Sequence, residues 1–217
     1  MCGRFTLAAP GEQVAAQFQL PATPELPARF NIAPTQQVAA VRAAEAGREL
    51  AMFRWGLVPS WAKDPSVGSR MINARAETAP EKPSFRSAFK RRRCLIPADG
   101  FYEWKREEGG KQPFYIHMND GHPFGFAGLW EIWHDELRTC AILTTSPNAV
   151  AAEVHDRMPV ILPRENYDAW LDPEAEREEL VSLLVPYEDD DLEAYPVSRF
   201  VNSPRNNDER CIEPVAA

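Results

Sequence analysis

Residues 124–133 read FGFAGLWEIW, and residues 137–144 read LRTCAILT. Both runs are short, largely apolar and rich in aromatic or β-branched side chains, a composition that is typical of β-strands. The turn signal Asn119-Asp120-Gly121 stands shortly before the first run and indicates where an element boundary falls. We therefore predict two strands that follow each other closely along the chain, and a fold dominated by sheet.

The rest of the chain repeats this pattern of short apolar runs, and its 20 prolines favour strands and loops over long helices. Residues 36–42 and 49–55 alternate apolar and polar positions around a connection that contains Gly47, which predicts a β-hairpin. Further strands are predicted at residues 93–98, 101–105 and 113–118. Helices are predicted at residues 12–20, 163–171 and 174–184, and an acidic loop at residues 188–191. We expect one α+β domain over residues 1–217, with a predominantly antiparallel sheet and a few helices.

Length and composition exclude several classes of protein. The chain has 217 residues, enough for a sizeable core, and no apolar run approaches the roughly 18 residues of a membrane span. The N-terminal segment does not match a secretory signal. Cys2, Cys94, Cys140 and Cys211 are scattered without metal-binding spacing. We therefore expect a reduced, cytoplasmic protein with no metal, cofactor or membrane partner, and with Cys94 and Cys140 in the core.

The charge is distributed unevenly along the chain. The net charge of −8 argues against a generic nucleic-acid binder, yet residues 1–110 hold 16 Lys and Arg against 11 Asp and Glu, whereas residues 111–217 hold 8 against 21. Such a division can accompany a basic binding face on an otherwise acidic protein. The densest basic cluster, residues 90–93, fits either a solvated face before a strand or a set of phosphate contacts.

The second residue acquires unusual chemistry if Met1 is removed. Methionine aminopeptidases act where the next side chain is small, so Cys2 is expected at the mature N-terminus. An α-amine has a pKa of about 7.7–8.0 and a thiol of about 8.5, so both groups are partly available as nucleophiles at neutral pH. A 1,2-aminothiol can condense with an aldehyde to an imine and close to a five-membered thiazolidine. A small second residue also serves protein turnover, so Cys2 alone leaves both interpretations open.

Three other segments place polar side chains where a fold alone does not require them. If their segment is extended, Asn73, Arg75 and Glu77 share one face, as the solvent face of an ordinary strand also would. Glu103 stands among aromatic residues that would desolvate it and raise its pKa, unless it points to water from an edge strand. His155 precedes an Asp and an Arg and is a candidate general acid–base.

A loop rich in Gly and Pro carries Trp55 and Trp61. Trp55 ends a predicted strand and is expected in the core. Trp61 is the better candidate for stacking on an unpaired base, an interaction worth roughly 1–3 kcal/mol. The segment FNIAP at residues 30–34 predicts a rigid turn.

Taken together, these segments resemble the SRAP family, the SOS response-associated peptidases or abasic-site-processing proteins. The resemblance rests on MCGRF at residues 1–5, FNIAP at 30–34, WGLVP at 55–59, INARAET at 72–78, ADGFYEW at 98–104, HDRMP at 155–159 and PVS at 196–198. These segments span nearly the whole chain in one order, so the joint pattern is far more specific than any single motif.

The resemblance implies a barrel-like, twisted and predominantly antiparallel sheet. It also implies a protein of the DNA damage response that senses abasic sites in single-stranded DNA and joins to them covalently. On this interpretation the Cys2 amine attacks C1′ of the ring-opened sugar, and the Cys2 thiol closes a thiazolidine. Glu103 would transfer protons, His155 would protonate the ring oxygen, and Asn73 would position Cys2 and the sugar. The implied DNA-binding residues are Arg4, Asn31, Pro34, Trp61, Arg75, Arg86, Thr144 and Arg157.

The family resemblance carries further expectations about activity and location. It implies β-elimination at the imine stage, which is an AP-lyase activity, and removal of Met1 as a peptidase step. We expect a monomer without an obligate protein partner, in the cytoplasm and associated with the nucleoid when bound to DNA. Two departures affect details: Ala62 follows Trp61 where some relatives carry a second Trp, and residues 81–86 are less alike, which bears on Arg86.

Two other functions fit parts of the chain. An N-terminal-nucleophile amidohydrolase of the glutaminase type also begins Met-Cys-Gly, with the Cys2 thiol as nucleophile and its own amine as base, but that chemistry does not need the His155 segment. A non-covalent single-stranded DNA-binding module would need no chemistry from Cys2. Ammonia release from glutamine and adducts that survive denaturing electrophoresis distinguish the three.

Overall fold

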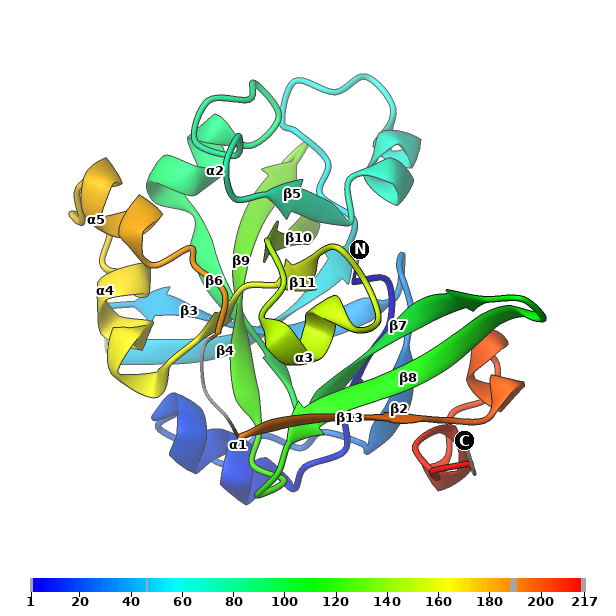
Figure 1. Ribbon diagram of the computed structural model, residues 1–217. Helices are drawn as coiled ribbons and strands as arrows, with labels where there is room; N and C mark the ends of the chain where they lie inside the picture. Colours follow the sequence, from blue (N-terminus) through cyan, green and yellow to red (C-terminus); the bar gives the residue numbers. More distant parts are fainter. Residues whose placement is uncertain (1, 46, 188–190, 216–217) are drawn as a thin grey trace.

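A closed barrel forms the centre of the computed structural model, which describes residues 2–45, 47–187 and 191–215 (Figure 1). Its strands are β3 (Gln37–Ala44), β4 (Gly47–Trp55), β6 (Arg93–Ala98), β9 (Phe124–Trp133) and β10 (Leu137–Thr145). They pair in the circular order β10-β4-β3-β6-β9 and back to β10, and every pair is antiparallel except β10–β4. Closure satisfies the strand edges that an open sheet would expose. The expected α+β, barrel-like and mostly antiparallel fold is therefore confirmed.

The sequence pattern located the barrel strands to within two residues. The bounds predicted for β6 and β9 match those observed. β4 begins two residues earlier than predicted, β10 ends one residue later, and β3 begins one residue later and ends two residues later. The predicted hairpin between residues 36 and 55 is the β3–β4 pair. The turn signal at residues 119–121 is also a turn, with Gly121 at φ +70°, but it does not close a hairpin. It connects residues 110–118, a strand of the second sheet described below, to β9 of the barrel.

A second sheet lies beside the barrel. Its order is β13-β8-β7-β1-β2, with every pair antiparallel. The strands are β1 (Phe5–Leu7), β2 (Arg29–Ile32), β7 (Gly100–Glu107), β8 (Gly110–Met118) and β13 (Leu192–Pro196). The β7–β8 hairpin projects away from the barrel in Figure 1. β7 and β8 were predicted, whereas β1, β2 and β13 are too short for an alternating pattern to identify them.

Three short strands extend the barrel. They are β5 (Asn73–Arg75), β11 (Met158–Pro159) and β12 (Ile161–Leu162). β5 pairs in parallel with β10, and the chain then turns over residues 76–80. The extended segment considered over residues 71–78 therefore ends at Arg75, and Glu77 does not share a strand face with Asn73. The correction has a local cause, because the Ala76 N–H still bonds to Thr144 while the following amides bond back into turns.

The helices are short and lie around the two sheets. They are α1 (Gly11–Phe18), α2 (Arg86–Arg91), α3 (Ala149–Ala152), α4 (Tyr167–Leu171) and α5 (Arg177–Ser182), with 3₁₀ turns η1 (Pro65–Arg70), η2 (Arg164–Asn166), η3 (Arg199–Asn202) and η4 (Glu209–Cys211). None of the described helices is long and apolar enough to cross a membrane.

The helix predictions were right in place but too long. α1 buries Val14 and Phe18, as its spacing predicted. The helix predicted over residues 163–171 divides into η2 and α4. The helix predicted over residues 174–184 shrinks to α5, which buries Leu180; Leu184 is also buried but lies beyond the end of the helix. The acidic loop predicted at residues 188–191 lies, except for its last residue, outside the described part of the chain.

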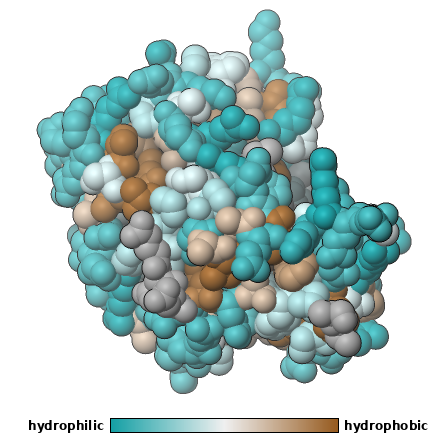
Figure 2. Space-filling view, viewed as in Figure 1, coloured by the Kyte–Doolittle hydropathy of each residue, from teal (hydrophilic) through white to brown (hydrophobic). Residues whose placement is uncertain are grey.

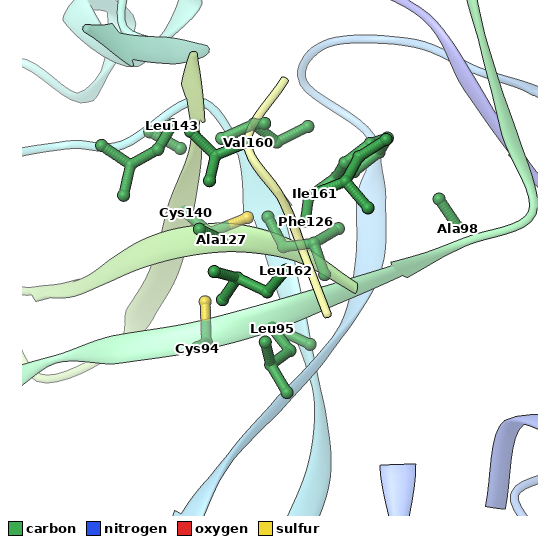
Figure 3. Packing of buried hydrophobic residues seen from close by; sticks show 14 of the residues in the cluster. Cys94, Leu95, Ala98, Phe126, Ala127, Cys140, Leu143, Val160, Ile161 and Leu162 are labelled. Carbon is green, nitrogen blue, oxygen red and sulfur yellow. The ribbon is translucent and has the colours of Figure 1, made fainter. Parts of the chain in front are cut away.

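The barrel interior contains the predicted apolar side chains. Figure 3 shows Cys94 of β6 and Cys140 of β10 among residues of β9 and the segment 160–162. Both cysteines are fully buried, and burial raises the pKa of each thiol, so both remain protonated. Trp55 is also fully buried. The core assignments of these three residues are confirmed.

The basic cluster at residues 90–93 does not form one continuous face. Arg92 forms an ion pair with Glu131 at 2.6 Å. Arg93 is buried and donates hydrogen bonds to backbone carbonyls at the ends of α2 and α4. Lys90 and Arg91 alone remain exposed. Half of the cluster therefore attaches helices to the barrel.

Candidate active site

β1 places Cys2 at the junction of the two sheets. The Tyr102 N–H donates to the Arg4 carbonyl at 2.9 Å, and Phe5 pairs with Phe101. Cys2 precedes this pairing by two residues and therefore lies beside the strand that carries Glu103. The Cys2 side chain is fully buried.

Asp99 and Gly100 fix the register of β1 against β7. The Asp99 carboxylate accepts hydrogen bonds from the Ala8 and Ala9 backbone and from the Thr6 hydroxyl. A Cβ on Gly100 would lie 2.2 Å from the Tyr115 ring, so no larger residue fits there. The motif at residues 98–104 therefore both carries Glu103 and holds β1 in position against β7.

Asn73 holds the backbone of Cys2 from the barrel side. Its Nδ2 donates to the Cys2 carbonyl at 2.7 Å, and pairing between β5 and β10 fixes its position. The Asn73 Oδ1 is buried and has no hydrogen-bond partner among the described residues. A buried amide oxygen without a partner is costly, so this atom is available to accept a hydrogen bond from a group that enters the site.

Glu103 enters the site from β7. Its residue surface is 2% exposed, so it does not point to water from an edge strand. Burial raises the pKa of Glu103 to about 7, as its aromatic neighbours predicted. A carboxyl group with this pKa is populated in both protonation states at neutral pH, which suits a group that both accepts and donates protons.

His155 enters from the excursion between β10 and β11. Asn148 caps α3 by accepting the Ala151 N–H at 2.9 Å, and the His155 N–H bonds back to Ala151. The His155 Nε2 lies 4.0 Å from Glu103 Oε2. Nδ1 lies 3.1 Å from the Arg157 backbone nitrogen and 2.9 Å from Asp156 Oδ1, which orients the ring with Nε2 toward Glu103.

The electrostatics of the site favour neutral groups. Burial and then the neighbouring charge of Glu103 raise the pKa of the Cys2 thiol, so the thiol stays protonated until a base removes its proton. Burial lowers the pKa of His155, which makes its protonated form scarcer and a stronger acid. The arrangement can therefore move protons between an acid–base pair and a protonated thiol.

A cavity of about 870 Å³ opens beside Glu103 and His155. Its other lining residues are Trp104, Arg106, Lys111, Val154, Asp156 and Asn202. Sequence reasoning missed these residues, because a wall built from a hairpin, a loop and the segment after β13 has no signature in one stretch of sequence. Among the described residues, no group of three or more His, Cys, Asp or Glu is placed to hold a metal ion.

Arg4 and Asn31 were both predicted to bind DNA. In the structure their side chains form a hydrogen-bond network with the segment around residues 201–206. Asn31 is 2% exposed, and its Nδ2 donates to the carbonyls of Val201, Ser203 and Asn206. Arg4 Nη1 donates to Asn31 Oδ1 at 2.7 Å and to the Val201 carbonyl at 2.9 Å. The two side chains attach the segment after β13 to β1 and β2, and a role of either at DNA stays a prediction.

Removal of the Asn31 amide should therefore reduce stability. We expect Asn31→Ala to lower the free energy of unfolding by about 2–4 kcal/mol, because Arg4 would lose one of its two acceptors and three carbonyls would each lose one hydrogen bond. Urea denaturation measures the change. Asn202→Ala, which removes one hydrogen bond to Trp104, supplies the scale for a single bond. Unchanged stability with weaker DNA binding would instead make Asn31 a DNA contact.

Thr144 and Arg157 were also predicted to bind DNA, and both make contacts within the protein. Thr144 is fully buried. The Arg157 guanidinium bonds to both carboxylate oxygens of Glu77 and to the Thr144 carbonyl. Glu77 is the ion-pair partner of Arg157, and contact of Arg157 with DNA stays a prediction. The Arg157–Glu77 pair connects the turn after β5 to the His155 segment.

The remaining predicted DNA-binding residues are accessible. Trp61 is 64% exposed, Arg75 and Arg86 are exposed, and Pro34 is partly exposed. Trp61 lies in a loop that the Trp133 side chain holds by donating from its indole nitrogen to the Ala62 carbonyl. None of the four lines the cavity beside Glu103.

Known proteins of one family match this chain over nearly its whole length. A family model described as SOS response associated peptidase (SRAP) matches residues 1–204. The chain is 47% identical over 222 residues to the abasic site processing protein YoqW of Bacillus subtilis (strain 168), covering 98% of this chain and 99% of that protein. It is 31% identical to the abasic site processing protein YedK of Escherichia coli (strain K12), with 99% and 100% covered.

A solved structure shows the same architecture. A crystal structure of a protein from Bacteroides thetaiotaomicron matches with a TM-score of 0.87 and 28% identity, covering 99% of this chain and 100% of that chain. The family model, the relatives and the shared fold lead to one conclusion: the chain belongs to the SRAP family.

Proposed function

We propose that this protein recognises abasic sites in single-stranded DNA and joins to them covalently through Cys2. The observation that carries the proposal is the convergence of Asn73, Glu103 and His155 on one aminothiol residue from three different parts of the fold. The relatives named above are abasic site processing proteins, and a ring-opened abasic sugar is an aldehyde, the electrophile that a 1,2-aminothiol traps.

The first step requires a free amine. Hydrolysis of the Met1–Cys2 bond turns the Cys2 nitrogen from an amide into an amine. The amine lone pair attacks C1′ of the open-chain sugar to give a carbinolamine, which loses water as the imine forms. Because burial keeps the thiol protonated, the amine is the better first nucleophile.

The second step closes the ring. The Cys2 sulfur adds to the imine carbon, its proton leaves to a base, and the imine nitrogen gains a proton, so no oxidant or cofactor is needed. Glu103 is the base and acid for this transfer, because its pKa of about 7 allows both roles. The product is a five-membered thiazolidine that carries the DNA strand on C1′.

His155 and Asn73 assist at the sugar. His155, 4.0 Å from Glu103, delivers a proton to the ring oxygen as the sugar opens, and Glu103 supplies or removes protons at the other end of the pair. Asn73 holds the Cys2 carbonyl and offers Oδ1 to the amine. β-Elimination at the imine competes with ring closure, so a minor strand-cleaved product is expected on the same gel as the adduct.

The adduct experiment tests the proposal. Purified protein and a single-stranded oligonucleotide with one abasic site should give a band that withstands SDS and heat, while the undamaged oligonucleotide gives none. A non-covalent binder would leave no such band, and an amidohydrolase would release ammonia from glutamine instead. Intact-mass measurement beforehand establishes that Met1 is absent.

Trp61 should contribute to DNA binding without contributing to stability. We expect Trp61→Ala to weaken non-covalent binding of single-stranded DNA by roughly 1–3 kcal/mol, because a lone exposed indole is an accessible stacking surface. Fluorescence anisotropy with an unreactive abasic analogue measures this effect. Trp61→Phe retains a ring and should recover most of the affinity. Equal binding by all three proteins would remove Trp61 from the interface.

Other expectations remain predictions. The organisation as one domain over residues 1–217 predicts a single cooperative unfolding transition. The monomeric state predicts one species near the chain mass in sedimentation. Localisation to the cytoplasm and, with DNA, to the nucleoid also remains to be measured.

A further inference from the structure

The cavity beside Glu103 and His155 has a second wall whose residues have no role in the chemistry proposed above. This wall is made by the β7–β8 hairpin and η3. It carries two cations, Arg106 of β7 and Lys111 of β8. Figure 2 shows that hydrophilic residues cover the projecting end of this hairpin.

The two cations face each other across the hairpin. Arg106 and Lys111 are direct cross-strand partners, and both are exposed. Like charges in opposite positions destabilise a strand pair. Neither side chain forms an ion pair with an acidic residue in the part of the chain that the structure describes. The neighbouring Glu107 alternates to the other face of the strand. The two cations therefore have no ion-pair partner in the described part of the chain; Asp156, which also lines the cavity, lies 2.9 Å from His155 Nδ1 instead.

The positive charge of this wall also affects the pKa of His155. Burial is the main cause of the lowered pKa of His155; the negative charge of Asp156 opposes the shift, and the positive charge of Lys111 adds a smaller contribution to it. One cavity thus has an acid–base pair on one side and two accessible cations on the other. Asn202 holds the same wall in place by accepting the Trp104 indole N–H at 2.8 Å.

We propose that Arg106 and Lys111 form a phosphate-binding subsite that holds one phosphodiester of the reacting DNA strand next to the abasic sugar. The strand would then pass between this hairpin and the barrel side, where Trp61 and Arg75 lie. Two cations converging on one cavity wall match the geometry and charge of a phosphodiester. The subsite rests on the proposed function, because the sugar must first occupy the cavity.

The test compares Arg106→Gln/Lys111→Gln with the wild type. An oligonucleotide with an unreactive abasic analogue is titrated at several salt concentrations. We expect the double variant to bind about tenfold more weakly and its salt dependence, the slope of log K against log [salt], to fall by roughly 0.7 for each phosphate that the variant no longer binds. Arg164→Gln is the matched control, because Arg164 is an exposed cation that lines a separate cavity. It should leave both values unchanged.

Strand polarity sharpens the test. Oligonucleotides that extend from the lesion on only one side should show the weaker binding for one polarity and not for the other. An equal effect for both polarities, an equal effect of Arg164→Gln, or an unchanged salt slope in the double variant would each overturn the subsite.

The subsite and the proposed function can fail separately. If the wild type forms no adduct with abasic DNA, the proposed function is wrong. If the wild type forms the adduct and the double variant binds as tightly as the wild type, the subsite alone is wrong. Both substitutions are on the surface and relieve a like-charge pair, so the melting temperature should not fall.

Discussion

Cys2→Ala should abolish the heat-stable adduct with abasic single-stranded DNA. Alanine retains the α-amine after Met1 is removed, so an imine can still form, but without the sulfur no thiazolidine can close. The imine hydrolyses under denaturing conditions, so the stable yield should fall to background. Quantitative denaturing electrophoresis over a time course measures the loss. A stable yield equal to that of the wild type would contradict the thiazolidine mechanism.

Two controls separate the amine from the sulfur. Cys2→Ser also allows an imine and can close an oxazolidine, which should be less durable than the thiazolidine and decay faster on heating. A protein that retains Met1 keeps the thiol but lacks the free amine, and it should give no adduct. If the protein with Met1 reacts as fast as the mature form, the thiol is the first nucleophile and the proposed order of steps is wrong.

Glu103→Gln should slow adduct formation by about 10²–10⁴-fold, the usual contribution of a general acid–base group. Glutamine preserves the shape of the side chain but cannot exchange a proton. Non-covalent binding of an abasic analogue should change little, because Glu103 is 2% exposed. Single-turnover kinetics measure the rate and anisotropy measures the affinity. Equal losses in rate and affinity would make Glu103 a structural residue.

The same substitution should raise stability at alkaline pH. The pKa of Glu103 is raised from 4.5 to about 7 in the folded protein, so the folded state holds its proton more tightly than the unfolded state does. Stability is therefore unaffected by this group below about pH 4.5, and it falls as the pH rises to about 7. At pH 8 the wild type carries a penalty of about 3 kcal/mol that Glu103→Gln lacks.

Urea unfolding at pH 5 and at pH 8 measures this linkage. The difference in the free energy of unfolding between Glu103→Gln and the wild type should be small at pH 5 and favour the variant at pH 8. Asp208→Asn, which alters an exposed carboxylate paired with Arg210, serves as a control and should not gain stability at alkaline pH. A difference that is independent of pH would show that Glu103 titrates near its ordinary value.

Local pattern predicted the barrel because its strands are long enough to show their composition. β6 and β9 could be placed by their apolar runs alone. β1 and β5 could not, because three residues leave no periodicity, and their strand character comes from partners far away in the chain. The extension of a strand through Glu77 was wrong for the same reason: pairing with β10 ends at Arg75, and this depends on tertiary contacts.

The DNA-binding predictions show a second limit. Arg4 and Asn31 have the residue types expected of phosphate and sugar contacts, yet their hydrogen-bonding groups bind the segment around residues 201–206. A sequence shows which donors exist but not where they point. Trp61 is exposed, as its place in a loop of Gly and Pro predicted, and its contact with DNA stays a prediction.

The sequence by itself determined the family and the chemistry available at the proposed nucleophile, because an amine and a thiol on adjacent carbons belong to one residue and need no partner to exist. Only the tertiary structure decided which side chains surround Cys2 and what protonation states they adopt. Asn73 lies 71 positions from Cys2 along the chain and still holds its carbonyl, and Glu103 acquires its raised pKa from burial that several strands create together. Distance and desolvation arise from packing, so no single segment could specify either.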